Sequence, residues 1–533
     1  MSSRKLLIVG VDAASPTWLR RWTADGTLPN IAAFMAAGLV GETRNIEGFE
    51  GSTWPSFATA VGTGKHGFYW QQQLKPGTYR ILGCDPGDHI SQPMLWETLS
   101  AAGRRVVLLD IPMCPPSPNL NGVQRVEWGG HDLAFGFQTT PPGLRREILA
   151  AVGPYPYPGR CDVASRSTEE CRAFADLLLK AVPLGTRLAR ETLHREPWDF
   201  AIQVYGEAHC AGHQLWHLHD PGHPAYDPEV TARFGNPVRE VYVAIDQAIG
   251  ELLADVSPDT TVVLMSLHGM APPWGAAILI PEILERLGVK QYPLAPAPEG
   301  GNDGGGHRLL ALYRRLPVQI RQPIYRVRQY VNQRLLRRGE PLGFDPARTR
   351  AFDIILGGAF SGIRLNLRGR EPHGILESGA EAERFITGLR RDLLEITDLR
   401  TGRPAISRII RTAEEFPGPK LDGLPDLIVV WNEENALGTT NAGGGKGARV
   451  KVSSPKIGTV EGVNSYCRTG DHLLEGLFVV RGPGIAPGKL DRVVRTIDLA
   501  PTFARMMGCE MRDVDGVPIP ELLDAPVAAG SGR

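Results

Sequence analysis

The chain has no excess of either charge. Lys plus Arg and Asp plus Glu number 58 each, so the formal net charge is +0 at pH 7. The chain as a whole therefore lacks the basic field that draws a protein to nucleic acid polymers or anionic lipid surfaces. We expect neither a nucleic acid polymer nor a membrane as its partner.

Paired cysteines and long apolar runs are also missing. The seven cysteines are scattered over 533 residues without C-x-x-C spacing, which argues against a disulfide framework. No apolar stretch reaches the length of a membrane span, and the first apolar run, residues 6–11, is too short for a signal peptide. These absences predict a cytoplasmic protein with reduced thiols.

Short runs rich in Val, Ile and Leu alternate with helix-like segments along most of the chain. Runs of this kind cover residues 6–11, 105–109, 201–205 and 261–265. Apolar strands without a polar face, separated by helices, are typical of a parallel sheet that is covered on both sides. The sequence therefore predicts an α/β protein with a central, mostly parallel sheet.

This alternation stops between residues 291 and 346. A stretch rich in Pro and Gly, residues 293–306, precedes an Arg-rich segment with apolar residues at helical spacing. We interpret residues 291–346 as a helical insertion or lid. Residues 1–290 and 347–533 then form the α/β core, with further strands expected at residues 362–367 and 427–431.

Metal-capable side chains follow or adjoin the strand-like runs. They are Asp12, the pair His209 and His213 at helical i, i+4 spacing, His268, and His472. Ligands collect at the carboxyl ends of strands in an open α/β sheet, so residues far apart in sequence can converge there. Each residue alone is as readily explained as a helix cap, a turn or a packing residue. Together they indicate a metal-assisted hydrolase.

The order and context of these segments resemble the alkaline phosphatase superfamily, and most closely its type I phosphodiesterase and nucleotide pyrophosphatase branch. The matching segments, which extend over nearly the whole chain, are residues 9–13, 54–59, 64–67, 266–270, 366–374, 469–472 and 496–503. The resemblance implies the three-layer sandwich of alkaline phosphatase with a central, mostly parallel sheet. It is less specific for the substrate.

The resemblance also implies the metal ligands. One ion would be held by His209, His213 and His472, and a second by Asp12 and His268 together with the nucleophile. Zinc is the ion implied, as one or two ions, with manganese as the alternative. This sequence departs from its relatives at two ligand positions. His209 stands where they commonly carry aspartate, and Leu267 replaces the aspartate that usually precedes the histidine at 268.

The nucleophile position is ambiguous in sequence. Counting back from His66 places it at Glu50, whereas counting from Trp54-Pro55 places it at Thr53, with Ser52 beside it. Either Ser52 or Thr53 is the nucleophile, or Glu50 is a metal ligand or altered catalytic group that replaces the charge missing at position 267. A third alternative is a site that has lost turnover.

The resulting expectation is a metal-dependent hydrolase or transferase acting on a phosphodiester or pyrophosphate in a small, nucleotide-like substrate. Lys65 and Arg370 are candidates for substrate contact, although an ion pair within the protein is the better explanation of each residue taken alone. The first alternative is a phosphonate or sulfate ester hydrolase, or a phosphomutase, on the same scaffold. The second is a metal-binding pseudoenzyme that recognises a phosphorylated ligand.

Overall fold

The fold was analysed in a computed structural model of the 533-residue chain. The structure describes residues 5–45, 48–129, 134–157, 166–293, 340–357, 359–437, 441–442, 446–447, 449–463 and 468–523. Most of the predicted insertion, residues 294–339, lies outside the described residues. Its assignment as a lid therefore stays a prediction.

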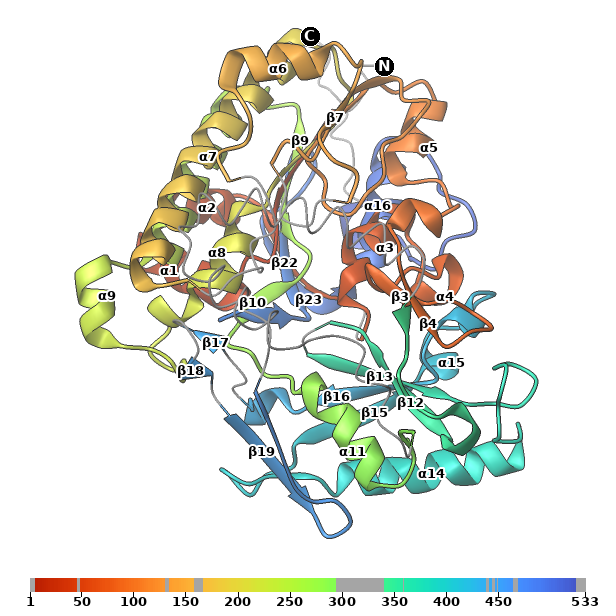
Figure 1. The fold of residues 1–533 in the computed structure, drawn as a ribbon. Coiled ribbons are helices and arrows are strands. Elements are labelled where there is room, and N and C mark those ends of the chain that lie inside the picture. Colours follow the sequence, from red (N-terminus) through yellow and green to blue (C-terminus); the bar gives the residue numbers. More distant parts are fainter. Residues whose placement is uncertain are drawn as a thin grey trace, which may run out of the picture.

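A nine-stranded sheet forms the centre of the molecule (Figure 1), in the order β23-β2-β22-β9-β1-β8-β5-β6-β7. Five neighbouring strands, β9, β1, β8, β5 and β6, are parallel, whereas β22 and β7 run antiparallel to their partners. The strands are β1 (Leu6–Val11), β2 (Leu39–Arg44), β5 (Val106–Leu109), β6 (Gly122–Val126), β7 (Gln138–Thr140), β8 (Phe200–Tyr205), β9 (Thr261–Ser266), β22 (Glu475–Arg481) and β23 (Gly488–Arg495).

Helices cover both faces of this sheet (Figure 1). One layer contains α1 (Pro16–Ala24), α2 (Pro29–Ala36), α7 (Thr168–Arg195), α8 (Glu207–Leu215) and α10 (Pro237–Ala254), and the other contains α3 (Thr53–Thr59), α5 (Leu95–Ala101) and α16 (Leu499–Met506). Side chains of β1 alternate between the two layers. Leu7 and Val9 pack with the first, and Leu6 and Ile8 with the second. The predicted three-layer α/β architecture is confirmed.

A second, four-stranded antiparallel sheet lies beside the central one, in the order β12-β13-β16-β15. Its apolar cluster also includes side chains of α11 (Ile280–Arg286) and α14 (Ala380–Leu394). The strands are β12 (Ala351–Ile355), β13 (Phe360–Leu365), β15 (Ile406–Arg411) and β16 (Leu427–Trp431). The strands expected at residues 362–367 and 427–431 are thus β13, shifted by two residues, and β16.

Shorter elements connect these layers. The strands are β3 (Gln72–Leu74), β4 (Arg80–Gly83), β10 (Gly269–Ala271), β11 (Glu340–Pro341), β14 (Thr397–Asp398), β17 (Asn441–Ala442), β18 (Lys446–Gly447), β19 (Arg449–Ser454), β20 (Gly458–Val463) and β21 (Asp471–Leu473). The helices are α4 (Thr63–His66), α6 (Leu144–Val152), α9 (Pro228–Phe234) and α15 (Thr412–Glu415). Among the described residues, no helix combines the length and apolar character needed to span a bilayer.

Candidate metal centre and active site

Helix α8 brings two of the predicted ligands together. The helix begins two residues after β8 ends, at the carboxyl edge of the central sheet. His209 and His213 are one turn apart, so both rings lie on the same side of α8, with their centroids 4.3 Å apart. Small residues, Ala208, Ala211 and Gly212, allow the helix to pack closely, and both histidines are buried.

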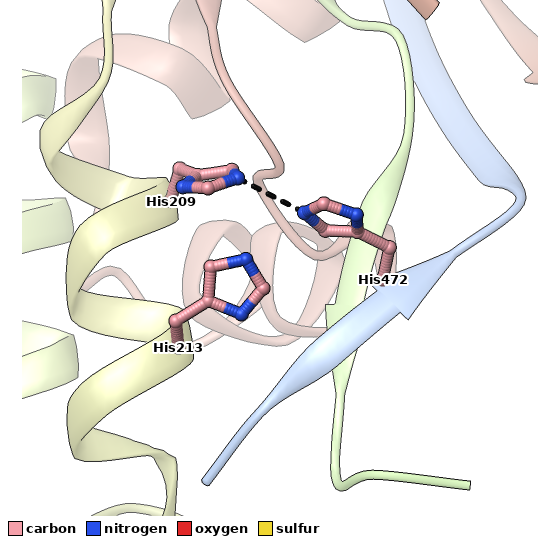
Figure 2. Close-up of side chains that lie close together, drawn as sticks. All are labelled: His209, His213 and His472. Carbon is pink, nitrogen blue, oxygen red and sulfur yellow. Dashed lines mark hydrogen bonds between the residues drawn. The ribbon is translucent and has the colours of Figure 1, made fainter. Parts of the chain in front are cut away.

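A two-stranded ribbon adds two more histidines. β10 begins directly after His268, and it pairs antiparallel with β21, where Met270 lies opposite His472. This pairing places the rings of His268 and His472 with their centroids 4.5 Å apart. Figure 2 shows His472 reaching from β21 towards His209 and His213 on α8. The Nε2 atoms of His209 and His472 are 2.9 Å apart.

The strand and the helix can approach this closely because of glycine. A Cβ atom at Gly470 would lie 2.4 Å from the carbonyl oxygen of Gly212, so a larger residue would push β21 away from α8. The backbone N–H of Thr469 donates to the carbonyl of His213 at 2.6 Å. The Nδ1 of His213 also lies 2.8 Å from the carbonyl oxygen of Gly470. Because a carbonyl only accepts, Nδ1 carries the proton, and the Nε2 lone pair of a neutral ring is left for a cation.

Three imidazoles therefore form a set that fits a transition-metal ion. The ligand atoms of His209, His213 and His472 all lie within 4.8 Å of one another, and all three residues are buried. Neutral imidazoles suit zinc and its neighbours better than magnesium or calcium. A second group that meets the same distance criterion is Glu50, Asp471 and His472. His472 belongs to both groups.

Asp12 and His268 form a smaller, neighbouring pair. The Nε2 of His268 lies 4.0 Å from Oδ1 of Asp12, and both side chains are buried. The same carboxylate oxygen accepts a hydrogen bond of 2.8 Å from the indole N–H of Trp54. Asp12 follows β1 and Trp54 lies in α3, so this bond ties the predicted nucleophile helix to the edge of the sheet.

Whereas His209 lies near Nε2 of His472, Glu50 lies near Nδ1 of the same ring. Its Oε2 is 3.4 Å from Nδ1 of His472, and only 6% of the residue is exposed. Without a bound cation, burial raises the pKa of Glu50 to about 8, partly offset by the charge of Arg468. A carboxylate that faces the second nitrogen of a ligating imidazole orients the ring and strengthens it as a ligand.

Thr53 and Ser52 have different surroundings. Thr53 lines the same pocket as Asp12, His209, His268 and His472. Its hydroxyl accepts from the Nδ2 of Asn45 at 2.6 Å and donates to the carbonyl of Glu50 at 2.7 Å. Ser52 is fully buried, and its hydroxyl donates to the carbonyl of Phe49 at 2.8 Å.

A chain of buried hydrogen bonds from His66 through Ser56 holds Ser52 in place. The N–H of Phe68 donates to Nδ1 of His66 at 3.0 Å, so Nε2 carries the ring proton and donates to Ser56 Oγ at 2.8 Å. Ser56 in turn donates to Ser52 at 3.3 Å. Burial lowers the pKa of His66 to about 3, so its ring is neutral at physiological pH. We name His66, Ser56 and Ser52 the serine relay.

The serine relay predicts an effect of Ser56 on turnover. In Ser56→Ala the turn that presents Thr53 loses one anchor, and we expect kcat to fall by roughly 10-fold because reacting groups tolerate little misplacement. KM and metal content should not change. Thr59→Val is the matched control, since Thr59 is a buried hydroxyl of the same helix that bonds only within it, to Pro55. Equal kinetics for both variants would contradict the role of the relay.

The pocket also contains a residue that the motifs did not single out. Arg468 is 7% exposed, and its Nη1 lies 3.7 Å from Oδ1 of Asp471. It precedes the Asp471-His472 pair by only three positions, which is the signal that could have identified it. The polar side chains lining the pocket are those of Asp12, Glu50, Thr53, Gln71, His209, His268, Arg468 and His472.

The predicted substrate contacts Lys65 and Arg370 lie elsewhere. Lys65 pairs with Asp515 at 2.6 Å. Arg370 pairs with Asp426 at 2.7 Å and Glu371 at 2.9 Å, beside the four-stranded sheet. Neither residue is among those that line the pocket. The ion-pair interpretation therefore describes both residues in this structure, and their contact with substrate stays a prediction.

The architecture places imidazole, carboxylate and hydroxyl groups together at one edge of the sheet, and these are the groups from which ester hydrolases build their sites. The sequence profile of the type I phosphodiesterase/nucleotide pyrophosphatase family matches residues 6–295. The chain belongs to this family, which indicates a phosphoester hydrolase. No curated protein matches it.

Solved structures with the same fold are distant in sequence. Phosphonoacetate hydrolase from Sinorhizobium meliloti, in complex with phosphonoacetate, is 15% identical with a TM-score of 0.52, over 95% of this chain and 96% of that one. The structure of the same enzyme in complex with phosphonoformate is 14% identical to this chain with a TM-score of 0.50, over 95% of this chain and 96% of that one. Murine ectonucleotide pyrophosphatase/phosphodiesterase 5, in complex with AMP, is 11% identical with a TM-score of 0.43, over 96% and 97% of the chains.

Proposed function

We propose that the protein is a metal-dependent phosphodiesterase that acts on a small phosphate diester or pyrophosphate, with Thr53 as its nucleophile. The observation that carries this proposal is that Thr53, Asp12, His209, His268 and His472 line one pocket although they come from five separate parts of the chain. Family membership supports the reaction class. The imidazole ligands support zinc as the proposed ion, with manganese as the alternative.

In the proposed reaction the Thr53 oxygen attacks phosphorus while the bond to the leaving oxygen breaks, and that oxygen takes up a proton. Water then attacks the phosphothreonine and releases the threonine hydroxyl. The Asn45 amide, 2.6 Å away, holds the Thr53 oxygen in place. A bound ion would supply charge neutralisation for the ester oxygens. His209, His213 and His472 would hold it, and Glu50 would keep the His472 ring oriented.

Arg468 is proposed to assist with the anionic substrate. Its guanidinium is permanently charged and buried at the pocket, where Nη1 lies 3.7 Å from the Asp471 carboxyl group. An entering phosphoryl group can share these donors with Asp471, because guanidinium matches the geometry of paired phosphate oxygens. This role, unlike those proposed for Lys65 and Arg370, is consistent with the lining of the pocket.

A substrate panel tests the function. Zinc-loaded protein is offered bis-p-nitrophenyl phosphate, p-nitrophenyl phosphate, p-nitrophenyl sulfate and p-nitrophenyl phenylphosphonate, and p-nitrophenol release is followed. We expect the diester to have the highest kcat/KM. Faster turnover of the phosphonate or sulfate ester would favour the alternative hydrolases. No turnover of any ester, with metal bound, would indicate the pseudoenzyme.

A further inference from the structure

We propose that the chain retains a single tightly bound transition-metal ion, at His209, His213 and His472, and that the position between Asp12 and His268 does not retain a second. The inference rests on the proposed function only in treating the pocket as a cation site. It does not require that the protein turn over any ester. It concerns how many ions this particular set of side chains can keep.

The three-histidine position has what a tightly bound ion needs. Structural and catalytic zinc sites ordinarily use three or four protein ligands. Here three imidazoles offer ligand atoms within 4.8 Å of one another. The carbonyl of Gly470 selects the tautomer of His213 that leaves Nε2 available, and Glu50 faces the outer nitrogen of His472. Both supporting contacts orient ligands towards the same point.

Among the residues that the structure describes, the position between Asp12 and His268 offers two protein ligand atoms of the usual kinds. The residue before His268 is Leu267, whose side chain is fully buried and packs in the apolar layer with Ile8 and Trp54. Asp12 also shares its Oδ1 with the Trp54 indole. Two protein ligands and a hydroxyl are too few to bind a transition-metal ion such as zinc tightly. An ion at this position would therefore dissociate when the free metal is removed.

The group of Glu50, Asp471 and His472 does not supply a second position either. It shares His472 with the three-histidine set. The guanidinium of Arg468 lies 3.7 Å from the Asp471 carboxylate, where it would repel a divalent cation.

Metal counting tests the proposal directly. Purified protein is saturated with zinc, dialysed against metal-free buffer, and assayed by elemental analysis. We expect about one zinc per chain, as for a single closed set of imidazoles. Two ions per chain, or none, would overturn the proposal. Because the count involves no substrate, an inactive protein with one ion would contradict the proposed function and leave this inference intact.

Two histidine variants distinguish the positions. His213→Ala should lose the ion, whereas His268→Ala should keep it, and a cobalt(II) titration of the visible spectrum should end at one equivalent in the latter. In a two-ion centre each variant would lose one of two ions. Loss of the ion from His268→Ala, or its retention by His213→Ala, would therefore overturn the assignment.

Leu267 provides a gain-of-ligand test. Leu267→Asp adds a carboxylate beside His268 and should bind a second equivalent of cobalt(II), while Leu267→Asn, with the same size and no charge, should not. A folded Leu267→Asp protein that still binds one equivalent would overturn the explanation based on Leu267. Should the buried aspartate prevent folding, the wild-type count and the histidine pair still decide the proposal.

Discussion

Zinc-loaded Thr53→Ala is expected to lose kcat on the order of 10²-fold or more while it keeps its ion, because the change removes the attacking oxygen and no imidazole ligand. The residue lines the pocket, and its hydroxyl is held by Asn45. The measurement is kcat with bis-p-nitrophenyl phosphate, together with the zinc content of the same preparation. KM should change little.

Ser52→Ala is the control for Thr53→Ala, because it removes the neighbouring hydroxyl instead of the proposed nucleophile. The Ser52 hydroxyl donates to the carbonyl of Phe49 and accepts from Ser56, the next member of the serine relay, and Ser52 is fully buried. We therefore expect a loss of roughly 10-fold, the size of a positioning effect. If Ser52→Ala proved the more damaging of the two, or if both variants kept full activity, Thr53 would not be the nucleophile.

Removal of His472 is expected to have the second large effect. His472 belongs to both groups of side chains that could hold an ion, so His472→Ala weakens either arrangement. Activity should fall by more than the roughly 10–100-fold that is typical of residues supporting a metal ligand. Excess zinc should not restore it, because the missing group is a ligand itself. The measurement is kcat/KM as a function of added zinc.

Glu50→Gln tests whether Glu50 only orients the His472 ring or takes part in the reaction itself. Glu50 faces Nδ1 of His472 at 3.4 Å, and glutamine retains an acceptor there without the charge. We expect zinc affinity to fall by roughly 10–100-fold, with activity recovering in excess zinc. Activity that stays low at saturating zinc would instead identify Glu50 as part of the chemistry.

The strands at the centre of the large sheet could be predicted from the sequence because they are continuous apolar runs. β8 and β9 were expected within a residue of their observed ends. The convergence of His209, His213, His268 and His472 was likewise predictable, since strand ends meet at one edge of a parallel sheet.

Side-chain direction was beyond sequence reasoning. Ser52 and Thr53 are adjacent, and only the turn into α3 aims one at the pocket and the other at the protein interior. Arg468 was identified as a site residue from the lining of the pocket, although its position three residues before Asp471 was a signal in the sequence. Lys65 and Arg370 were ambiguous because an arginine or lysine that binds substrate and one that pairs with a carboxylate have the same sequence signature.

The contact between α8 and β21 has a consequence for the stability of the whole chain. His209 and His472 are 263 residues apart in sequence, yet their ring nitrogens would hold the same ion. An ion bound there closes a loop of that length much as a disulfide would, and so restricts the unfolded chain. The proposed metal binding would thus also cross-link two parts of the chain that are far apart in sequence.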